Sequence, residues 1–520
     1  MNQWIEVYAP PAEPKPLLTL LQREGAAPHA PCGGRGNCGK CKVMAEGALS
    51  PMTGRERGFL REAEVSGGVR LACLTLVCGK ARACPLPDGE QVVLSAGVLP
   101  DFCRDRFAGG YGLAVDIGTT TVAAYLYRLD TGAPIAAASC GNPQGAFGAD
   151  VISRIEQSLA GRQSELAGAV LGCIGSLSGQ LCKKAGIAPG QILRAALTGN
   201  TAMLYLLTGR EASSLAAAPF APDCLFGESV DATQLGLSLA SGAQAYLPRC
   251  IAAYVGADMT CAILAGRLFA AKEPELLVDI GTNGEMALCV QGKLYACSTA
   301  AGPAFEGAGI SMGMNGGTGA VDHVWLTDGQ IRYSVIGGGP AKGICGSGLI
   351  DAAAVLREAG LLDETGRIPQ MDETASPYLT EQDGMPAVKL GESGVWLTQK
   401  DVRALQLAKS AICAGMRALL HEAGLSPDKV ERLTIAGGFG SFIDPANAEK
   451  IGMLPRGFAG KARVIGNAAG MGTGMVLLSR EERLRSEALA RACRVVELSG
   501  NPYFMERYVE DMLFEEPPKG

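Results

Sequence analysis

Four cysteines near the start of the chain have the residue type and spacing of ligands to an iron–sulfur cluster. Cys32, Cys38 and Cys41 lie in the Gly-rich segment APCGGRGNCGKCKV, and Cys73 follows after 31 further residues. Three thiolates on one loop and a fourth from a distant segment are the ligand pattern of a [2Fe-2S] cluster. Glycines let such a loop wrap closely, so that backbone N–H groups can face the negatively charged sulfurs. The sequence therefore predicts a carrier of single electrons near the N-terminus.

Other ligand sets fit this spacing less well. The spacing C-x5-C-x2-C has five residues where the plant-type pattern has four, so the match is to the broader class of ferredoxin domains. Zinc usually takes two compact cysteine pairs, whereas here three ligands share one loop. Cys78 and Cys84 follow soon after Cys73 and are rival fourth ligands. The segment RLAC resembles the one that carries the last ligand in ferredoxin domains, which favours Cys73.

An internal repeat is the second chemical feature. The segment LAVDIGTTTV, which contains Asp116, recurs 163 positions later as LLVDIGTNGE, which contains Asp279. Each copy is an apolar strand that runs into an Asp-x-Gly-Thr turn and then into a second β-rich run. Backbone N–H groups and hydroxyls of such a turn can hold phosphate oxygens, and the aspartate can reach a water on Mg²⁺. Two copies at this separation predict two similar lobes that face each other across a nucleotide.

Two glycine-rich segments in the second half of the chain could complete that site. CGSGLIDAAAVLREAG predicts a helix that begins near Gly346, and ERLTIAGGFG predicts a strand that ends at Gly437 and Gly438. A strand ending in Gly-Gly lets the backbone pack against a flat adenine and its ribose. Taken alone, the same glycines are equally typical of a tight turn.

Composition limits the remaining possibilities. A chain of 520 residues with 48% hydrophobic residues and 71 glycines is expected to form two to four Gly-rich α/β domains. A net charge of −6 provides no electrostatic basis for binding nucleic acid. We identify no 18-residue apolar run and no signal-peptide pattern, so no membrane span is expected. Eighteen cysteines favour a reducing compartment, hence the cytoplasm, and three histidines argue against histidine-based catalysis.

Taken in order, the motifs resemble the actin/sugar-kinase/Hsp70 ATPase superfamily. DIGTTT resembles its first phosphate motif, DIGTNG its second, CGSGLID the helix that connects the lobes, and IAGGFG the adenosine motif. The fusion to a cluster domain, with the segments NPQGAFGADVISRI, LTGNTAM, VGAD and AGGFGSFIDPANA, resembles the reductive activators of corrinoid proteins over nearly the whole chain. In that family, ATP binding and hydrolysis help to drive an electron from the ferredoxin domain onto an inactive cob(II)amide, which restores cob(I)amide.

The resemblance implies a multidomain protein of α/β and α+β class. A β-grasp-like [2Fe-2S] ferredoxin domain is expected at residues 1–88 and a linker at 89–110. A two-lobed actin-like, ribonuclease H-like ATPase domain follows, with its lobes at 111–270 and 271–500 and a C-terminal tail at 501–520. The implied cofactors are the [2Fe-2S] cluster, ATP and Mg²⁺. The implied partners are a corrinoid protein and an upstream electron donor such as a ferredoxin, and a homodimer would fit the family.

Particular residues follow from the matched motifs. Asp116 and Asp279 are expected to position Mg²⁺ and the attacking water, although the sequence assigns neither as the base and each could be a metal ligand only. The expected cluster ligands are the four cysteines Cys32, Cys38, Cys41 and Cys73. The expected nucleotide-binding residues are Gly118, Thr119, Thr120, Gly281, Thr282, Asn283, Gly346, Gly437 and Gly438.

The chain departs from the family at its start. WIEVYAP and PAEPKP stand where a longer β-hairpin would be expected, so one strand should be short or missing. The short stretch before Gly112 also leaves a separate middle domain small or absent. Two other functions stay open: an ATP-dependent donor to another low-potential metalloenzyme, and a metabolite kinase with a redox-sensing ferredoxin domain, because a fold does not fix function.

Overall fold

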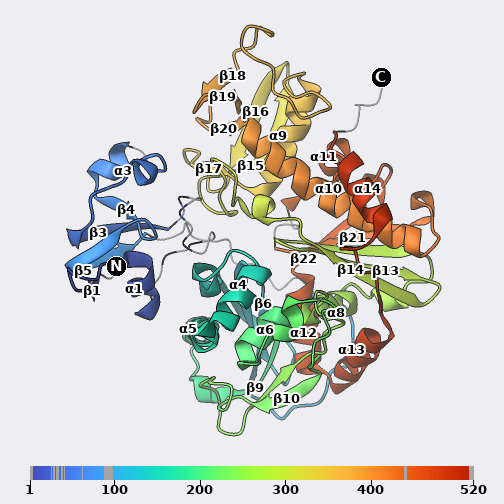
Figure 1. Ribbon diagram of the computed structural model, residues 1–520. Coiled ribbons are helices and arrows are strands. Elements are labelled where there is room, and N and C mark those ends of the chain that lie inside the picture. Colours follow the sequence, from blue (N-terminus) through green and yellow to red (C-terminus); the bar gives the residue numbers. More distant parts are fainter. Residues whose placement is uncertain are drawn as a thin grey trace.

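The chain folds into a small N-terminal domain beside a two-lobed body (Figure 1). The computed structural model describes residues 4–24, 26, 28, 30, 34, 36, 39, 41–60, 62–86, 98–438 and 442–514.

The N-terminal domain is an antiparallel sheet in the order β1-β5-β3-β4, covered by helix α1. Apolar residues of α1 three and four positions apart fall on one face, which buries Leu17 and Leu21 completely. Strands β1 and β2 pair one after the other with β5, so the expected first hairpin is reduced to one interrupted strand. The elements are β1 (Ile5–Tyr8), β2 (Lys15–Pro16), α1 (Leu17–Arg23), β3 (Lys42–Leu49), α2 (Gly54–Arg57), α3 (Glu62–Ser66), β4 (Val69–Leu71) and β5 (Leu76–Pro85).

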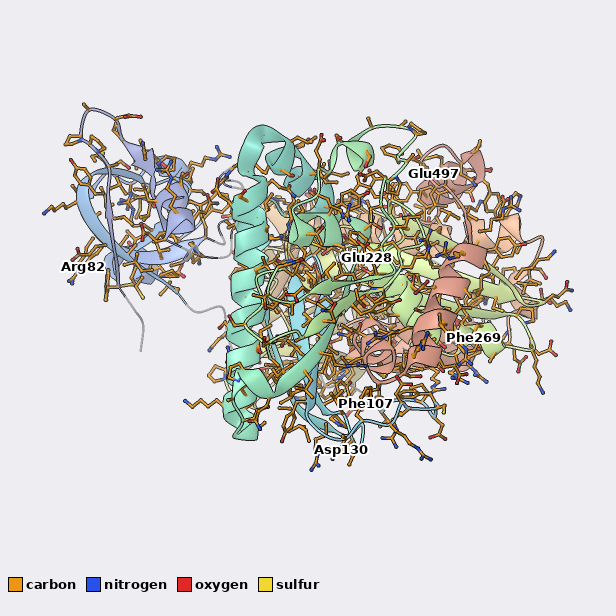
Figure 2. The ribbon with its side chains drawn as sticks, turned by 90° about the horizontal axis from the view of Figure 1, so that it is seen from below. Arg82, Phe107, Asp130, Glu228, Phe269 and Glu497 are labelled. Carbon is orange, nitrogen blue, oxygen red and sulfur yellow. The ribbon has the colours of Figure 1, made fainter. Side chains whose placement is uncertain are left out.

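Residues 98–110 connect this domain to the body without a helix or strand of their own. They lie against the first lobe: the Arg194 guanidinium stacks on Phe107 at 4.5 Å, and the Asp105 N–H donates to the carbonyl of Leu478 at 3.0 Å. Phe107 is labelled in Figure 2. The described part of the linker is therefore a packed surface segment without secondary structure of its own.

Each lobe is built on a six-stranded sheet, and five strands of the two sheets have the same arrangement, while the sixth lies at opposite edges. In both, three consecutive antiparallel strands are joined by two strands parallel to the first. The duplicated sequence thus becomes a duplicated topology. The first sheet contains β6 (Tyr111–Ile117), β7 (Thr121–Arg128), β8 (Pro134–Gly141), β9 (Ile192–Gly199), β10 (Glu228–Asp231) and β11 (Gln244–Leu247). The second contains β12 (Glu275–Ile280), β13 (Gly284–Val290), β14 (Lys293–Thr299), β21 (Arg432–Ala436), β22 (Ala462–Gly466) and β23 (Arg494–Val495).

Helices α8 (Ala257–Ala265) and α12 (Ala468–Leu478) share one apolar core with strands of both sheets. They pack so closely that a Cβ at Gly472 would lie 2.0 Å from the carbonyl oxygen of Cys261. The chain therefore returns to the first lobe after β22, and α12 and α13 (Arg480–Ala492) lie there (Figure 1). The sequence placed these residues in the second lobe.

The second lobe carries an extension of small sheets and helices. Its long helix α10 (Gln399–Glu422) packs on α14 (Pro502–Glu510), and the buried Lys409 ammonium donates to the carbonyls of Asp511 and Leu513. The segment expected as a tail thus contains a docked helix. The other elements of the extension are β15 (Ala320–Thr327), β16 (Gln330–Val335), β17 (Gly343–Ile344), α9 (Gly346–Glu358), β18 (Leu379–Gln382), β19 (Met385–Lys389), β20 (Trp396–Thr398) and α11 (Pro445–Lys450).

A long helical stretch, Val151–Ala185, lines the side of the first lobe that faces the N-terminal domain (Figure 2). It comprises α4 (Val151–Gln157), the π-helical turn η2 (Ser158–Arg162) and α5 (Gln163–Ala185). It is the one helix of the described chain that is long and apolar enough to cross a membrane, and α5 packs here against β7 and β8.

The N-terminal domain contacts this side of the lobe through α1. The Gln22 side-chain amide donates to the carbonyl of Ala146 at 2.6 Å, and the Arg162 guanidinium donates back to Gln22 at 3.1 Å. Ala146 ends the short helix η1 (Pro143–Ala146).

Candidate nucleotide and cluster sites

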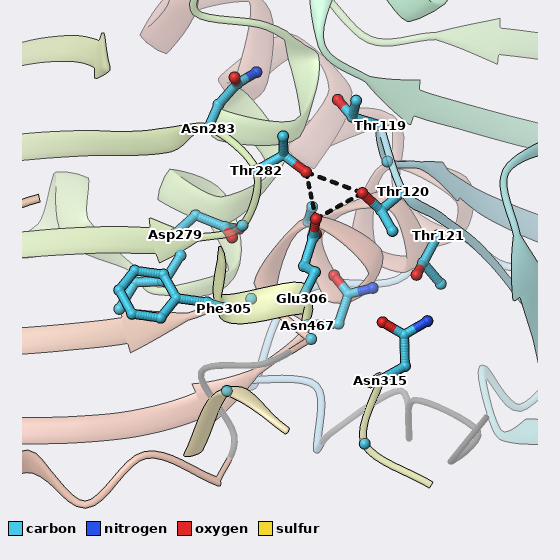
Figure 3. A pocket seen from close by; sticks show the side chains of 18 of the residues that line it. Thr119, Thr120, Thr121, Asp279, Thr282, Asn283, Phe305, Glu306, Asn315 and Asn467 are labelled. Atoms are coloured by element: carbon cyan, nitrogen blue, oxygen red, sulfur yellow. Dashed lines mark hydrogen bonds between the residues drawn. The ribbon is translucent and has the colours of Figure 1, made fainter. Parts of the chain in front are cut away.

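A cavity between the two lobes is lined by every residue that the sequence predicted to handle the nucleotide. The turn after β6 and the turn after β12 form opposite walls, since each strand delivers its Asp-x-Gly-Thr segment to the same gap (Figure 3). The start of α9 and the end of β21 complete the lining. The four motifs, far apart in the chain, therefore meet in one place.

The first turn is braced by its own lobe. The Asn142 amide donates to the Gly118 carbonyl at 2.8 Å, and the Asn200 amide donates to the Thr119 hydroxyl at 3.1 Å. The Arg154 guanidinium donates to the Thr119 carbonyl at 2.6 Å and is 1% exposed. Buried polar groups with such complete pairing resist movement. The backbone of this turn is therefore held in one conformation.

The second turn has fewer supports. The Gly302 N–H donates to the Thr282 carbonyl at 3.0 Å, which attaches the turn to the short helix η5 (Pro303–Glu306). The Thr282 hydroxyl donates to Glu306 at 2.5 Å, and the Thr120 hydroxyl of the first turn donates to the same oxygen at 2.6 Å (Figure 3). The two turns are thus tied to each other through one carboxylate.

Buried carboxylates dominate the electrostatics of the cavity. Burial raises the pKa of Asp116 to about 7, opposed by the hydrogen bond that the Asn467 amide donates at 2.8 Å. Burial, with the charges of Asp116, Asp258 and Glu306, raises the pKa of Asp279 to about 8. Burial likewise raises the pKa of Asp258 to about 6. The ionised forms of these carboxyls are therefore unfavourable in the cavity by themselves, and a bound cation would stabilise them.

The donor set fits Mg²⁺ held together with a nucleotide. Mg²⁺ prefers oxygen ligands and usually takes one or two carboxylates plus phosphate oxygens and waters. In the described part of the chain, no group of three acidic, histidine or cysteine side chains has the geometry of a complete metal site. Asp116 and Asp279 would together supply two carboxylates, one from each turn. This number suits an Mg²⁺ that is also bound to phosphates.

The other two walls offer backbone groups. Helix α9 begins at Gly346, and the free N–H groups of a helix N-terminus favour anions. Gly437, at the end of β21, has φ of +105°, and a Cβ there would lie 2.5 Å from the Ile280 carbonyl oxygen. Only glycine therefore allows the ends of β21 and β12 to approach this closely. Gly438 lines the cavity beside it.

The predicted cluster site is described in part. The sulfurs of Cys41 and Cys73 lie 3.2 Å apart although the residues are 32 positions apart in the chain. Cys32 and Cys38 lie outside the described residues. Cys78 and Cys84 sit on β5, where the Cys78 thiol faces the Leu76 carbonyl at 4.0 Å. Two thiol donors brought together from distant segments fit two of the four cluster ligands.

Glu56 holds the segment that carries Cys73. Its carboxylate is completely buried and accepts hydrogen bonds from the Arg70 guanidinium at 2.9 Å, the Leu71 N–H at 2.9 Å and the Thr75 hydroxyl at 3.1 Å. These bonds outweigh the effect of burial and lower the pKa of Glu56. The turn from Arg70 to Thr75 is thereby fixed from one side.

Comparison with known proteins identifies the family. One family model, described as the C-terminal domain of RACo, the ASKHA domain, matches residues 273–518, and another, the RACo middle region, matches residues 111–270. The corrinoid activation enzyme RamQ of Eubacterium limosum is 38% identical over 441 residues, which cover 82% of this chain and 74% of the relative. The chain belongs to the RACo family of reductive activators. The resemblance predicted from the motifs is confirmed.

Other members of the RACo family agree. A solved structure named reductive activator for corrinoid, iron-sulfur protein superposes with a TM-score of 0.73 at 29% identity and covers 98% of this chain and 96% of its own. A Co(II) methylated amine-specific corrinoid protein reductase of Methanosarcina barkeri is 27% identical over 393 residues, 69% of this chain and 68% of the relative. The actin-like ATPase fold predicted for the body is confirmed as well.

The sequence motifs assigned no role to several residues in or next to the cavity. Asn200 and Asp258, which line it, and Asn142 and Arg154, which hold its first turn, lie in the segments that carried the resemblance, but their spacing gave them no role. Glu285 directly follows DIGTNG, and burial raises its pKa well above the ordinary value. Glu306 and Asn467 had no signal beyond neighbouring glycines in GPAFEG and GNAAG.

Proposed function

We propose that this RACo family member is an ATP-dependent reductive activator that transfers one electron from a [2Fe-2S] cluster to the inactive cob(II)amide of a corrinoid protein, restoring cob(I)amide. One observation carries the proposal: a nucleotide cavity and a cluster-type thiol pair occur in one chain whose relatives are named for corrinoid activation and reduction. Neither feature alone would suffice, since ATPase lobes of this fold serve many functions.

In the proposed site, different cavity residues bind the Mg²⁺, the phosphates and the adenosine of ATP. Asp116 and Asp279 hold the metal, and the N-terminus of α9 favours the phosphates. The hydroxyls of Thr120 and Thr282 and the N–H of Thr282 donate to Glu306, so the phosphate contact of Thr120 falls to its backbone N–H, while Thr282 would exchange Glu306 for phosphate when the nucleotide binds. The remaining phosphate and adenosine contacts are proposed for Gly118, Thr119, Gly281, Asn283, Gly346, Gly437 and Gly438.

The cysteines would serve the electron transfer. Cys32, Cys38, Cys41 and Cys73 would hold the cluster, which supplies one electron at low potential. For a one-electron couple, each ~59 mV uphill costs about 1.4 kcal/mol. A plant-type cluster has a potential near about −400 mV, so an acceptor of still lower potential makes the step unfavourable. Closure of the lobes on ATP can offset this by stabilising a complex in which the acceptor's potential is altered.

The contact between α1 and the first lobe offers a physical route for that coupling. Gln22 bonds to Ala146 of η1, and η1 begins after Asn142, whose amide holds the Gly118 carbonyl of the first turn. Because this path is rigid, the first lobe and the cluster domain would move together when the second lobe closes on the nucleotide. We further propose a ferredoxin-type donor upstream, a homodimer and a cytoplasmic location, which suits the eighteen cysteines.

The test is anaerobic. The full chain is purified, its iron counted, and the protein mixed with Mg-ATP, a low-potential reductant and candidate cob(II)amide proteins while cob(I)amide absorbance is followed. We expect two irons per chain and reduction that requires ATP. Turnover of ATP on a small hydroxylated metabolite without any cobalt reduction would instead favour the kinase, and reduction of a different metalloenzyme would favour the other electron-donor function.

A pair of matched variants checks the cluster ligands. Cys73→Ser should abolish the visible absorbance of the cluster and cobalt reduction while ATP binding remains. Cys78→Ser removes a thiol from the neighbouring strand and should leave both intact. The opposite result would transfer the fourth ligand to Cys78.

A further inference from the structure

Glu306 lies between the two turns of the nucleotide cavity, where no sequence motif placed a functional group. Its Oε2 atom accepts hydrogen bonds from the Thr120 hydroxyl at 2.6 Å and from the Thr282 hydroxyl at 2.5 Å (Figure 3). The two hydroxyl oxygens are themselves 2.9 Å apart. Since the threonines come from different lobes, the carboxylate is oriented from both sides of the cavity.

The backbone that carries Glu306 is also fixed. Gly302 and Gly307 flank η5 with φ of +79° and +76°, values that favour glycine. A Cβ at Gly307 would lie 2.4 Å from the backbone nitrogen of Met314, so the segment is tightly enclosed. Between the two glycines, Phe305 is 1% exposed and anchors the helix in the core of the second lobe. The Glu306 side chain therefore starts from a rigid position.

The other carboxylates of the cavity are engaged differently. Asp116 accepts from Asn467, and Asp258 shares a hydrogen bond with Glu285. Asp322 accepts from the Ser334 hydroxyl at 2.6 Å. Of the cavity carboxylates that the structure describes, Glu306 is the one whose oxygen bonds to the hydroxyls of both turns. A phosphate held by both turns would lie next to this carboxylate.

We propose that Glu306 is the catalytic base of ATP hydrolysis, whose carboxylate holds the attacking water and takes its proton. The water oxygen forms a bond to the γ-phosphorus, and the bond from that phosphorus to the β–γ bridging oxygen breaks. ADP leaves with the electron pair, and the proton passes to Glu306 and then to solvent. This inference rests on the proposed function only in taking ATP as the substrate.

The surroundings suit that role. A general base must be held in place before the reaction, and two hydroxyl donors together with a rigid backbone provide this. The buried Arg154 guanidinium exerts a favourable charge on the ionised carboxylate. Burial has the larger effect and raises the pKa of Glu306, which makes it a stronger proton acceptor.

The test separates turnover from binding. Glu306→Gln keeps the shape of the side chain and can still accept from both threonines. Phosphate release under saturating Mg-ATP gives kcat, and calorimetric titration with a non-hydrolysable ATP analogue gives Kd. We expect kcat to fall about 100-fold or more, the usual contribution of a general base, with the Kd of the analogue within about threefold. Glu306→Asp should recover part of the loss.

Glu275→Gln is the matched control, because Glu275 lies at the opposite end of β12 and pairs with Arg432 at 3.4 Å, outside the cavity. It should leave kcat unchanged. A kcat of Glu306→Gln close to wild type overturns the proposal. A large change in Kd of either sign also overturns it, since Glu306 would then shape or compete for the phosphate site. Absence of ATP hydrolysis by the wild type overturns it too.

The outcome is independent of the corrinoid assay. If the wild type hydrolyses ATP, Glu306→Gln does not, and no corrinoid protein is reduced, then the proposed function fails and Glu306 remains the base. If corrinoid reduction occurs and Glu306→Gln hydrolyses ATP normally, then the proposed function stands and this inference fails.

Discussion

The two phosphate turns carry almost the same letters and have very different surroundings. The first turn is held by Asn142, Arg154 and Asn200 from its own lobe, and its Asp116 accepts from Asn467. The second turn is attached to η5, and among the described residues no donor hydrogen-bonds to the Asp279 carboxylate. Asp279 accordingly has the higher pKa of the two aspartates.

This difference suggests that the two turns respond differently to a bound nucleotide. A braced turn presents its backbone in one conformation, whereas a turn with one support can adapt when a cation and phosphates arrive. Asp279 gains more than Asp116 from a bound cation, because no donor offsets its burial. We therefore expect the second turn to change conformation when a nucleotide binds and the first turn to keep its conformation. Four predictions test this comparison, beginning with the largest expected effect.

Removing the main brace of the first turn should be severely destabilising. Arg154→Met leaves the Thr119 and Gly148 carbonyls without their donor and Glu306 without its nearby cation. Breaking such a buried charged network costs about 3–5 kcal/mol. Asn283→Ala, in the second turn, should change stability by less than about 0.5 kcal/mol. Thermal unfolding measures the stability of both variants. Equal losses of stability would contradict the view that the first turn is the more rigid one.

The glycine at the same place in each turn should differ in its tolerance of alanine. A Cβ at Gly118 would lie 2.7 Å from the Thr121 carbonyl oxygen, whereas the nearest atom to a Cβ at Gly281 is 3.6 Å away. Gly118→Ala should therefore cost about 1–3 kcal/mol, the usual cost of overpacking. Gly281→Ala should fold and melt like the wild type. A destabilised Gly281→Ala with an intact Gly118→Ala would reverse the assignment of the rigid turn.

Asn467 hydrogen-bonds to Asp116 and not to Asp279, so its removal should affect the first turn. Its amide donates to Asp116 at 2.8 Å and to the Tyr125 hydroxyl at 3.0 Å, and its oxygen caps α12 through the Gly470 N–H. Asn467→Ala should cost about 1–2 kcal/mol, as expected for a lost helix cap. Asn467→Asp keeps the cap but adds a charge beside Asp116. The Mg²⁺ concentration needed for ATP hydrolysis should rise in the alanine variant, and an unchanged requirement would contradict the anchoring role.

Stability should depend on pH in a way that reflects both aspartates. A carboxyl whose folded pKa is raised stabilises the folded state fully below its unfolded pKa, near 4, and this stabilisation is lost as pH rises through the folded pKa. For Asp116 and Asp279 the loss should extend to about pH 7 and about pH 8. The melting temperature in metal-free buffer should therefore fall between pH 5 and pH 8 by a few degrees.

Single variants show how much each aspartate contributes to the fall of the melting temperature with pH. Asp279→Asn should flatten it more than Asp116→Asn, since the pKa of Asp279 is displaced further. Added Mg-ATP should oppose the fall at pH 8, because a ligand bound to the folded state stabilises it. Equal slopes in the two variants would mean that the turns share one electrostatic environment.

Much of the site could be predicted because its chemistry is local. A strand, an aspartate, a glycine and a hydroxyl form a phosphate turn by themselves, so the DIGT repeat identified both walls of the cavity. The hydroxyls of Thr120 and Thr282 were expected to hold phosphates, but they donate to Glu306, which follows neither motif. Arg154 reads as one more charge on a helix, yet it is almost completely buried beside the first turn.

Contacts that cross the expected domain boundaries could not be predicted, for a related reason. The strands and glycines of residues 271–500 read as one lobe, but the small residues of α12 let it pack against Cys261 of α8 and return to the first sheet. The segment after residue 500 reads as a tail, whereas Ser410 of α10 donates to a carbonyl of α14 and Lys409 donates to the carbonyl of Asp511 directly after it. Such contacts join residues about one hundred to two hundred positions apart and leave no local pattern.

The sequence by itself determined the family, the duplicated lobes, the residues of the two turns and the cysteines available for a cluster. Each of these depends on local geometry or on the order of motifs, which the chain carries in its letters. Only the tertiary structure decided that the two nearly identical turns have unequal supports, that Asp279 is the less compensated aspartate, and that Glu306 lies between the lobes. Burial and long-range hydrogen bonds set those differences, and neither exists until the distant segments have packed together.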